Sequence, residues 1–155
     1  MSLNSVKEFF SAERFNVDII ELEDSSATVD LAAAALGVQP QLIAKTLAFK
    51  AGEKNILIVT SGNAKIDNRK YKDHFKTKAK MLTGEEVMQI TGHPVGGVCP
   101  FGLNTDMEIY LDESLKQFHE VYPAAGSPNC AVKLAVSDLE RLTGGIWLDV
   151  CQSSS

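Results

Sequence analysis

The stretch from Leu42 to Gly62, LIAKTLAFKAGEKNILIVTSG, constrains the possible folds of this chain most strongly. Its first half alternates apolar and polar residues, its second half is nearly all apolar, and Gly52 stands between them. A period of two, interrupted by a glycine turn, predicts two strands joined as a β-hairpin. The fold must therefore contain a sheet against which the other segments pack.

The other segments show either the helical or the strand period. Helices are predicted at residues 4–15, 28–36, 68–75, 83–91, 112–118 and 137–143, and further strands at 17–22, 107–112, 131–136 and 146–150. The predicted caps are Asn4 or Ser5, Thr28 with Gly37, Thr83 in a capping box with Glu86 and closed by Gly92, and Ser137. Because these elements do not alternate as regular βαβ units, we expect an α+β fold with a mixed, curved and largely antiparallel sheet.

At 155 residues the chain is most simply one domain covering residues 1–155, and residues 152–155 are expected to form a disordered tail. No apolar run is long enough for a transmembrane helix, so no membrane partner is expected. The N-terminus lacks the charged and apolar regions of a secretory signal. We therefore expect a cytoplasmic protein.

The cysteines and histidines of the chain are few and scattered, namely Cys99, Cys130 and Cys151, and His74, His93 and His119. They form neither a CxxC pair nor an HxxxH pair, and zinc requires clustered nitrogen and sulfur ligands. We therefore expect no metal, no other cofactor and no structural disulfide.

Residues 65–80 form a basic segment in a chain whose net charge is −5. The segment holds seven basic residues against two aspartates, and its members include Lys65, Arg69, Lys70 and Lys72. A local basic patch on an acidic body suits docking on a nucleic-acid backbone. A solvated helix face would show the same pattern, so both interpretations remain open at this point.

Lys45 lies within the first strand of the predicted hairpin. Because side chains alternate along a strand, Ile43, Lys45, Leu47 and Phe49 share one face, and this face is the more apolar one. A lysine on an apolar face either extends its ammonium to water or meets an anion. Lys45 is therefore a candidate ligand for a carboxylate or a phosphate.

The apolar loop VGGVCPFGL, residues 95–103, combines two glycines with a proline. Gly96 and Gly97 allow a ligand close to the main chain, and Pro100 stiffens the far side of the loop. The loop lacks the lysine and serine of a phosphate-binding loop and the serine of a nucleophile elbow. It is either a tight connection between two elements or a rigid set of N–H donors for a carbonyl oxygen that gains negative charge.

Two further features of the sequence, a cysteine and a second glycine turn, are weaker indications of a functional site. Cys99 is a possible nucleophile, but no histidine is placed by the sequence to activate it, and an apolar setting raises the pKa of a thiol. A second glycine turn, AAGSPN, precedes a predicted strand and contains Gly126 and Ser127. By itself this segment indicates only a turn.

Three segments, LGVQPQLIAKTLAFK, HPVGGVCPFGL and AAGSPNCAVKLAVSDLERLTGG, resemble in their order and spacing the YbaK/ProX family. This family includes the insertion domain of bacterial prolyl-tRNA synthetase, and the resemblance extends from about residue 15 to residue 150. It implies a trans-editing hydrolase that cleaves the ester of a wrongly charged tRNA, typically alanine or cysteine on the proline tRNA. It implies a mischarged tRNA as the partner, with an aminoacyl-tRNA synthetase as a second one.

The resemblance also implies residue roles. Lys45 matches the functional lysine, which binds the phosphate of the terminal adenosine or orients the aminoacyl end, and the amides of the Gly96–Pro100 loop hold the substrate carbonyl. The ammonium of Lys45 is therefore expected to face this loop across a single pocket. The implied catalytic residues are Lys45, Gly96 and Gly97, and the implied substrate-binding residues are Thr46, Val98, Cys99, Pro100, Phe101, Gly126 and Ser127. No protein nucleophile is implied, because water is activated by the ribose hydroxyl of the substrate.

Two departures from the family pattern concern specificity. The second turn reads Ala124-Ala125-Gly126, where cysteine-specific members often carry a serine, and Leu22 stands where they tend to have an aromatic residue. These departures argue against cysteine and leave alanine or another small amino acid. A non-catalytic module of the same fold, which binds aminoacyl-adenosine or tRNA, is the alternative.

Overall fold

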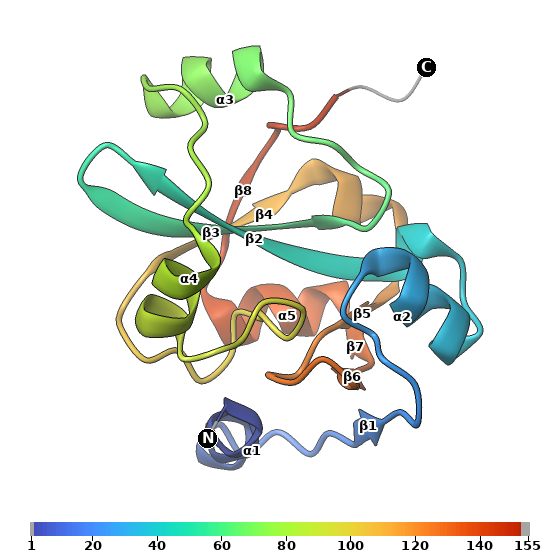
Figure 1. Cartoon of the computed structure of the whole chain (residues 1–155). Helices are drawn as coiled ribbons and strands as arrows, with labels where there is room; N and C mark the ends of the chain where they lie inside the picture. Colours follow the sequence, from blue (N-terminus) through green and yellow to red (C-terminus); the bar gives the residue numbers. More distant parts are fainter. Residues whose placement is uncertain (1, 153–155) are drawn as a thin grey trace.

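The computed structural model describes residues 2–152, and these form a sheet with helices on both faces (Figure 1). Six strands are ordered β7-β5-β2-β3-β4-β8, and a separate ribbon joins β1 to β6. The strands are β1 (Ile19–Glu21), β2 (Ile43–Ala51), β3 (Lys54–Ser61), β4 (Glu108–Asp112), β5 (Glu120–Pro123), β6 (Cys130–Val132), β7 (Leu134–Ala135) and β8 (Ile146–Leu148). The predicted hairpin is thus confirmed as β2 and β3, at the centre of the sheet.

The helices divide between the two faces of the sheet (Figure 1). They are α1 (Ser2–Ala12), α2 (Val29–Leu36), α3 (Asn68–Phe75), α4 (Gly84–Thr91) and α5 (Val136–Thr143), with short 3-10 helices at Pro40–Leu42 and Glu113–Gln117. Phe49 of β2 packs with Tyr71 and Phe75, so α3 covers one face, which we call the α3 face. Ala48 of β2 packs with Val87 of α4 and with Val98, so the opposite face, the loop face, carries α4 and the glycine loop.

Local capping explains where several helices begin and end. The Thr28 hydroxyl accepts the Leu31 N–H at the start of α2, and Gly37 closes that helix with a φ of +70°. Thr83 and Glu86 form the predicted capping box of α4. The α3 helix spans the predicted residues 68–75 and is capped by Asp67.

Four details differ from the sequence-based expectation. The first helix begins at Ser2 rather than at residue 4, and α5 has Ala135 at its N-cap position without a side-chain hydrogen bond, so Ser137 is not its cap. The strand expected at 131–136 is divided into β6 and β7, which pair with different partners. The short strand β5 was not predicted, because its residues 120–123 show no clear period.

The sheet is mixed, as predicted, but it is not largely antiparallel. The pairs β5–β2, β3–β4 and β4–β8 are parallel, and β2–β3 and β5–β7 are antiparallel. Of the tail expected at 152–155, Gln152 donates its N–H to the Lys65 carbonyl at 2.8 Å, and residues 153–155 lie outside the described part of the chain. Between residues 2 and 152, no helix combines the length and apolarity needed to cross a bilayer.

Candidate active site

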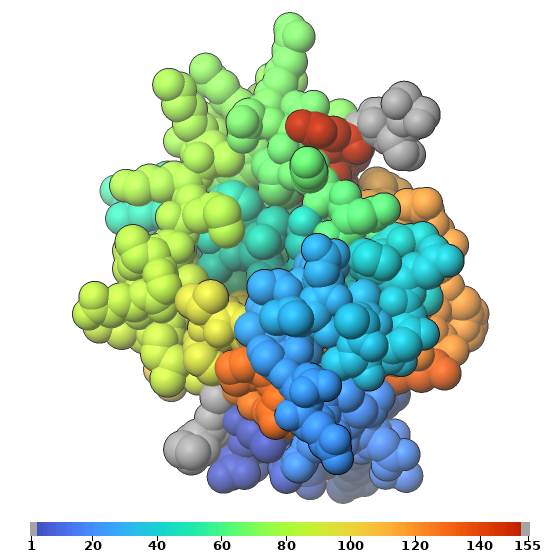
Figure 2. Space-filling view, turned by 45° about the vertical axis from the view of Figure 1, so that its right-hand side comes forward, coloured from blue at the N-terminus to red at the C-terminus, as the bar shows by residue number. Residues whose placement is uncertain are grey.

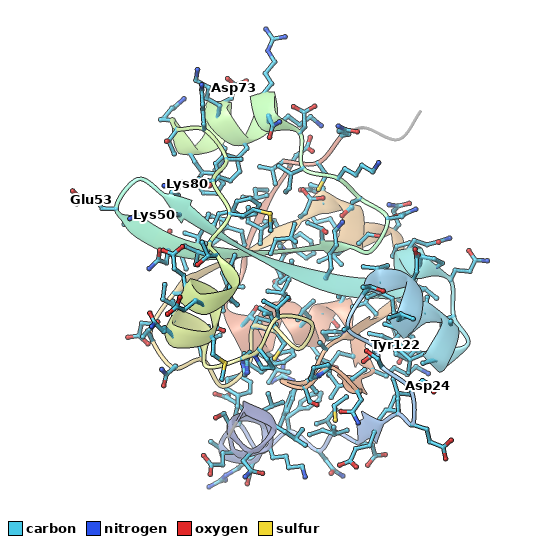
Figure 3. All side chains as sticks on the ribbon, in the orientation of Figure 1. Asp24, Lys50, Glu53, Asp73, Lys80 and Tyr122 are labelled. Carbon is cyan, nitrogen blue, oxygen red and sulfur yellow. The ribbon has the colours of Figure 1, made fainter. Side chains whose placement is uncertain are left out.

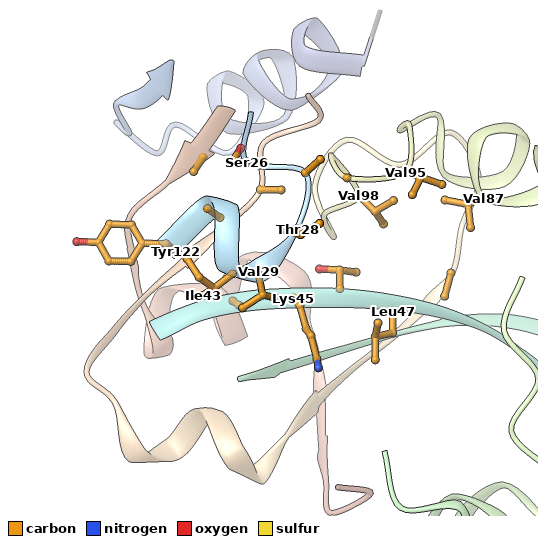
Figure 4. Close-up of a pocket in the computed structure, with 18 of the residues that line it drawn as sticks. Ser26, Thr28, Val29, Ile43, Lys45, Leu47, Val87, Val95, Val98 and Tyr122 are labelled. Atoms are coloured by element: carbon orange, nitrogen blue, oxygen red, sulfur yellow. The ribbon is translucent and has the colours of Figure 1, made fainter. Parts of the chain in front are cut away.

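The outer edge of β2 is covered at both ends and open in the middle. Next to Ile43 and Ala44 it pairs with β5, and at its other end it pairs with the segment 80–82, where Phe49 forms a bridge with Met81. A cavity of about 470 Å³ lies at the opening between them (Figure 4). In Figure 2, a strip of the teal hairpin is visible at this place, between blue residues of the chain and the yellow-green segment.

The walls of this cavity are mainly apolar and come from four regions of the chain. The first two regions are residues 26–29 with Ala32 and Leu36, and residues 43–48 of β2. The third region contributes Met81, Leu82, Gly84, Val87, Val95, Gly96 and Val98, and the fourth contributes Tyr122, Ala124, Cys130 and Ala131. No histidine, aspartate or glutamate is among these wall residues. The cavity is therefore largely apolar, and its wall offers no histidine or carboxylate side chain as a general base.

The two glycines of the loop, Gly96 and Gly97, have different structural roles. Gly96 has a φ of +91°, and an added Cβ would lie 2.9 Å from the Cβ of Ala27. Gly97 donates its N–H to the Pro94 carbonyl and accepts the Gly126 N–H, both at 2.9 Å. Both main-chain groups of Gly97 are therefore used within the protein, and Gly97 joins the two glycine turns.

Two other amides of the loop remain available. Within residues 2–152, the N–H groups of Gly96 and Val98 have no hydrogen-bond partner, and both residues line the cavity. Both residues are half-buried at the cavity wall, so their N–H groups, which are obligatory donors, remain open to a ligand or to water. These two amides are candidate donors for an oxygen atom of a ligand.

Lys45 differs from the expected geometry. Its side chain lies on the α3 face, and Figure 4 shows it on the opposite side of β2 from Val98. The ammonium donates a hydrogen bond to the Ala64 carbonyl. Burial lowers the pKa of Lys45; Cys151 opposes this shift, and the neighbouring Lys65 adds to it. The expectation that this ammonium faces the glycine loop is therefore wrong, because alternation along β2 places it on the other face.

Thr46, the next residue, lies on the loop face with Ala44 and Ala48. Its hydroxyl oxygen is buried and has no hydrogen-bond partner within the described chain. Thr46 therefore brings an unsatisfied polar group to a cavity that is otherwise apolar.

Several predicted substrate-binding residues do not line the cavity. Val98 and Thr46 do so, whereas Cys99, Pro100, Phe101, Gly126 and Ser127 lie behind the wall or in the adjoining turn. Cys99 and Phe101 are completely buried and belong to the main core cluster. They support the loop from behind, because a glycine loop needs a packed base to keep one conformation.

A small buried polar cluster supports the loop. His93 Nε2 donates to the Phe101 carbonyl at 2.7 Å and lies 3.6 Å from the Cys99 sulfur atom. Burial lowers the pKa of His93 and raises the pKa of the Cys99 thiol to about 12. At neutral pH the pair is therefore an uncharged imidazole and a thiol, not an activated nucleophile.

This pair yields a prediction. Cys99→Ala is expected to keep most of the ester hydrolysis that the family resemblance implies, because the Cys99 thiol stays protonated at neutral pH and does not line the cavity. The substitution is expected to cost about 1 kcal/mol of stability through lost packing. Turnover and urea unfolding measure the two effects. Complete loss of turnover in a folded Cys99→Ala variant would show that the thiol takes part in the chemistry.

The basic segment lies on the α3 face, away from the glycine loop. Lys70 is bound to Asp149 at 3.0 Å and to the Cys151 carbonyl at 2.9 Å. Lys65, Arg69 and Lys72 are exposed. Figure 3 shows Asp73 on α3 and, further along the segment, Lys80 beside Lys50, whose N–H donates to the Lys80 carbonyl.

The sequence did not single out the wall formed by residues 26–29 or by Met81 and Leu82. Thr28 was recognised only as a helix cap, and Met81 shows no pattern typical of a site. Among the described residues, no group of histidine, cysteine and acidic side chains is arranged to hold a metal ion.

The arrangement described above belongs to a known class of domain. Residues 23–142 match the model of the aminoacyl-tRNA editing domain, so the chain belongs to this family, and the resemblance to YbaK/ProX proteins is confirmed. The chain is 49% identical over 154 residues to YwhH of Bacillus subtilis (strain 168), an uncharacterized protein, with 98% of both chains covered.

Two further comparisons are with a proline–tRNA ligase and with a solved structure of similar fold. It is 30% identical over 121 residues to the proline–tRNA ligase of Bacillus licheniformis, covering 75% of this chain but only 21% of the ligase. A solved structure described as "a putative trans-editing enzyme for prolyl tRNA synthetase" superposes with a TM-score of 0.90 at 31% identity, covering 98% of each chain. The single-domain α+β fold is thus shared with that protein.

Proposed function

We propose that this protein is an aminoacyl-tRNA deacylase that hydrolyses the ester between a small amino acid and a wrongly charged tRNA, the proline tRNA in particular. Membership of the editing-domain family supports this proposal. The observation that carries it is the pair of unpartnered amides, Gly96 and Val98, on the wall of an apolar cavity. Fixed N–H donors in an apolar site stabilise the charge that develops on an ester carbonyl oxygen.

The chemistry follows from what the cavity contains. The Gly96 and Val98 amides polarise the carbonyl, and each such donor contributes about 3 kcal/mol to transition-state stabilisation. Because no histidine or carboxylate is on the wall, the substrate's own ribose hydroxyl assists the attacking water. Catalysis then rests on positioning and electrostatics rather than on a covalent intermediate.

Lys45 contacts the nucleotide end of the aminoacyl-tRNA, whereas the Gly96 and Val98 amides contact its ester carbonyl. The cavity is lined by Lys45 and Leu47 from the α3 face and by Thr46 and Ala48 from the loop face, so a bound ligand crosses the open edge of β2. An ammonium has three donor hydrogens, and among residues 2–152 only Ala64 accepts one of them. The remaining donors bind the phosphate of the terminal nucleotide, and Lys65, Arg69 and Lys72 extend the positive surface along the tRNA.

The size of the acyl side chain is limited by the wall. Small residues surround the position of the acyl group, including Ala44, Ala48, Ala124 and Ala131. An apolar pocket distinguishes side chains that differ by one methylene only weakly. Alanine and amino acids of similar size are therefore the expected acyl groups, each released as the free amino acid while the tRNA leaves through its ribose oxygen.

A panel of mischarged tRNAs tests the function. Proline tRNA carrying alanine, cysteine, serine or proline is incubated with a catalytic amount of the protein, and the remaining ester is measured over time. We expect several turnovers per protein molecule on a small amino acid and little hydrolysis of the correct prolyl ester. Stoichiometric protection of the ester without turnover would instead identify a binding module.

A further inference from the structure

On the open part of the β2 edge, the main-chain groups of one residue, Thr46, point outward without a hydrogen-bond partner within residues 2–152. Lys50 donates its N–H to Lys80 at 2.9 Å, and the Ala48 carbonyl accepts the Leu82 N–H at 3.0 Å. Even-numbered residues of β2 therefore direct their main-chain groups away from β3, and Thr46 does so as well. Its N–H and C=O have no partner within residues 2–152, because β5 ends beside Ala44.

These main-chain groups are directed toward the cavity. Tyr122 and Ala124 on one side of the gap and Met81 and Leu82 on the other all line it. The unpartnered Thr46 hydroxyl is beside the same opening. Thr46 is half-buried and its hydroxyl oxygen is fully buried, so three polar groups of this one residue that have no protein partner beside an apolar cavity indicate a polar ligand.

The pattern of these groups identifies the ligand chemistry. In an antiparallel pair, two opposing residues exchange both main-chain hydrogen bonds. An α-aminoacyl ester carries an amine and a carbonyl on one carbon atom, as a residue in a strand does. It therefore matches Thr46 in the way that a peptide strand matches the edge of a sheet.

We propose that the aminoacyl group binds as a one-residue strand, with its amine donating to the Thr46 carbonyl and its carbonyl oxygen accepting the Thr46 N–H. This proposal rests on the proposed function and specifies its substrate as an L-α-aminoacyl ester. The bound residue takes the ladder position that Gly84 would occupy if the strand pairing of 80–82 continued. As the carbonyl oxygen becomes the oxyanion of the tetrahedral intermediate it carries three lone pairs, so the Gly96 and Val98 amides can donate to it together with the Thr46 N–H.

Chirality follows from the pairing. Directly opposed residues in a sheet place their side chains on the same face. An L-aminoacyl group opposite Thr46 directs its side chain to the loop face, toward the apolar wall that includes Ala48 and Val98. A D-aminoacyl group in the same pairing directs its side chain to the α3 face, toward Lys45.

Hydrolysis of proline tRNA carrying L-alanine, D-alanine or β-alanine tests this pairing with the full chain. A D-alanyl group can place its side chain against the apolar wall only by giving up a hydrogen bond to Thr46, so we expect its ester to be hydrolysed about 100-fold more slowly than the L-alanyl ester, as for the loss of one aligned donor. The β-alanyl ester, whose amine is one carbon further away, is expected to be equally poor. Equal rates for the L and D esters would overturn the pairing while leaving the deacylase function intact.

A binding measurement separates the two proposals. The stable amide analogue of L-alanyl-adenosine is added to the isotope-labelled protein, and the N–H resonance of Thr46 is followed. A downfield shift with the L analogue and none with the D analogue supports the pairing, even in the absence of hydrolysis. Binding of the L analogue without a change at Thr46 would refute it.

Two variants complete the test. Thr46→Pro removes the N–H that points into the gap without removing a β2–β3 hydrogen bond, and proline is tolerated where an edge N–H faces outward. Thr46→Val is the matched variant, which keeps the N–H and removes the hydroxyl. We expect Thr46→Val to retain the preference for the L ester and a folded Thr46→Pro to lose it; if Thr46→Pro does not fold, the resonance measurement on the unmodified protein decides.

Discussion

Lys45→Ala is expected to lower kcat/KM for deacylation of mischarged tRNA by at least about 100-fold, because it removes a charge-assisted contact to the terminal phosphate. The fold is expected to change little. Burial lowers the pKa of Lys45, so the folded state disfavours the charged ammonium and does not depend on it. We expect the free energy of unfolding to stay within about 1 kcal/mol of the wild-type value.

Lys54→Ala is the matched control for this variant. Lys54 belongs to the same hairpin, but it is exposed and paired with Glu108 at 3.0 Å, away from the cavity. It removes one positive charge without touching the proposed site, so its kcat/KM is expected to remain close to wild type. Turnover by Lys45→Ala comparable to that of Lys54→Ala would remove Lys45 from the substrate site.

Gly97→Val is expected to abolish deacylation and to destabilise the fold by about 3 kcal/mol. A Cβ at this position would lie 2.6 Å from the Ser127 nitrogen and 2.8 Å from the carbonyl carbon of Gly126. These are main-chain atoms, so they cannot move aside as the end of a flexible side chain can. The substitution therefore forces the two glycine turns apart, and the loop that holds the Gly96 and Val98 amides moves with them.

Gly37→Ala separates this steric effect from the general cost of replacing a glycine. Gly37 has a φ of +70°, and nothing lies within 4 Å of the position of an added Cβ. We expect a loss of about 1 kcal/mol from the left-handed conformation alone, with deacylation retained. Urea unfolding and turnover assays on both variants measure this contrast, and a Gly97→Val variant as stable as wild type would contradict the close packing of the turns.

The periodicity of the chain was sufficient to predict most of the elements around the site. The hairpin, α3, and the caps of α2 and α4 depend on interactions within a few residues, and such signals are visible in one sequence. The parallel pairs, the short strand β5 and the division of the predicted strand 131–136 into β6 and β7 were not predictable in this way. Their pairing is set by packing between segments that are distant along the chain.

The residues with the clearest sequence signals do not all perform the expected task. Gly97 attracted attention as a possible substrate contact, but its N–H and C=O connect two turns of the protein. The resemblance implied that Thr46 binds substrate, but periodicity did not show that its main-chain and side-chain groups are unpartnered beside the cavity. A polar group can be judged available only when all its neighbours are known, and these neighbours come from four separate regions of the chain.

The amino-acid sequence alone determined the family, the α+β class, the central hairpin, and the presence of Lys45 and the glycine loop within one domain type. Only the tertiary structure decided that Lys45 and the loop lie on opposite faces of β2, that β5 and the segment 80–82 leave one residue of its edge uncovered, and that Gly96 and Val98 keep unpartnered amides. The physical reason is that local periodicity specifies which side chains share a face, whereas the segment that covers each face or edge is selected by long-range packing.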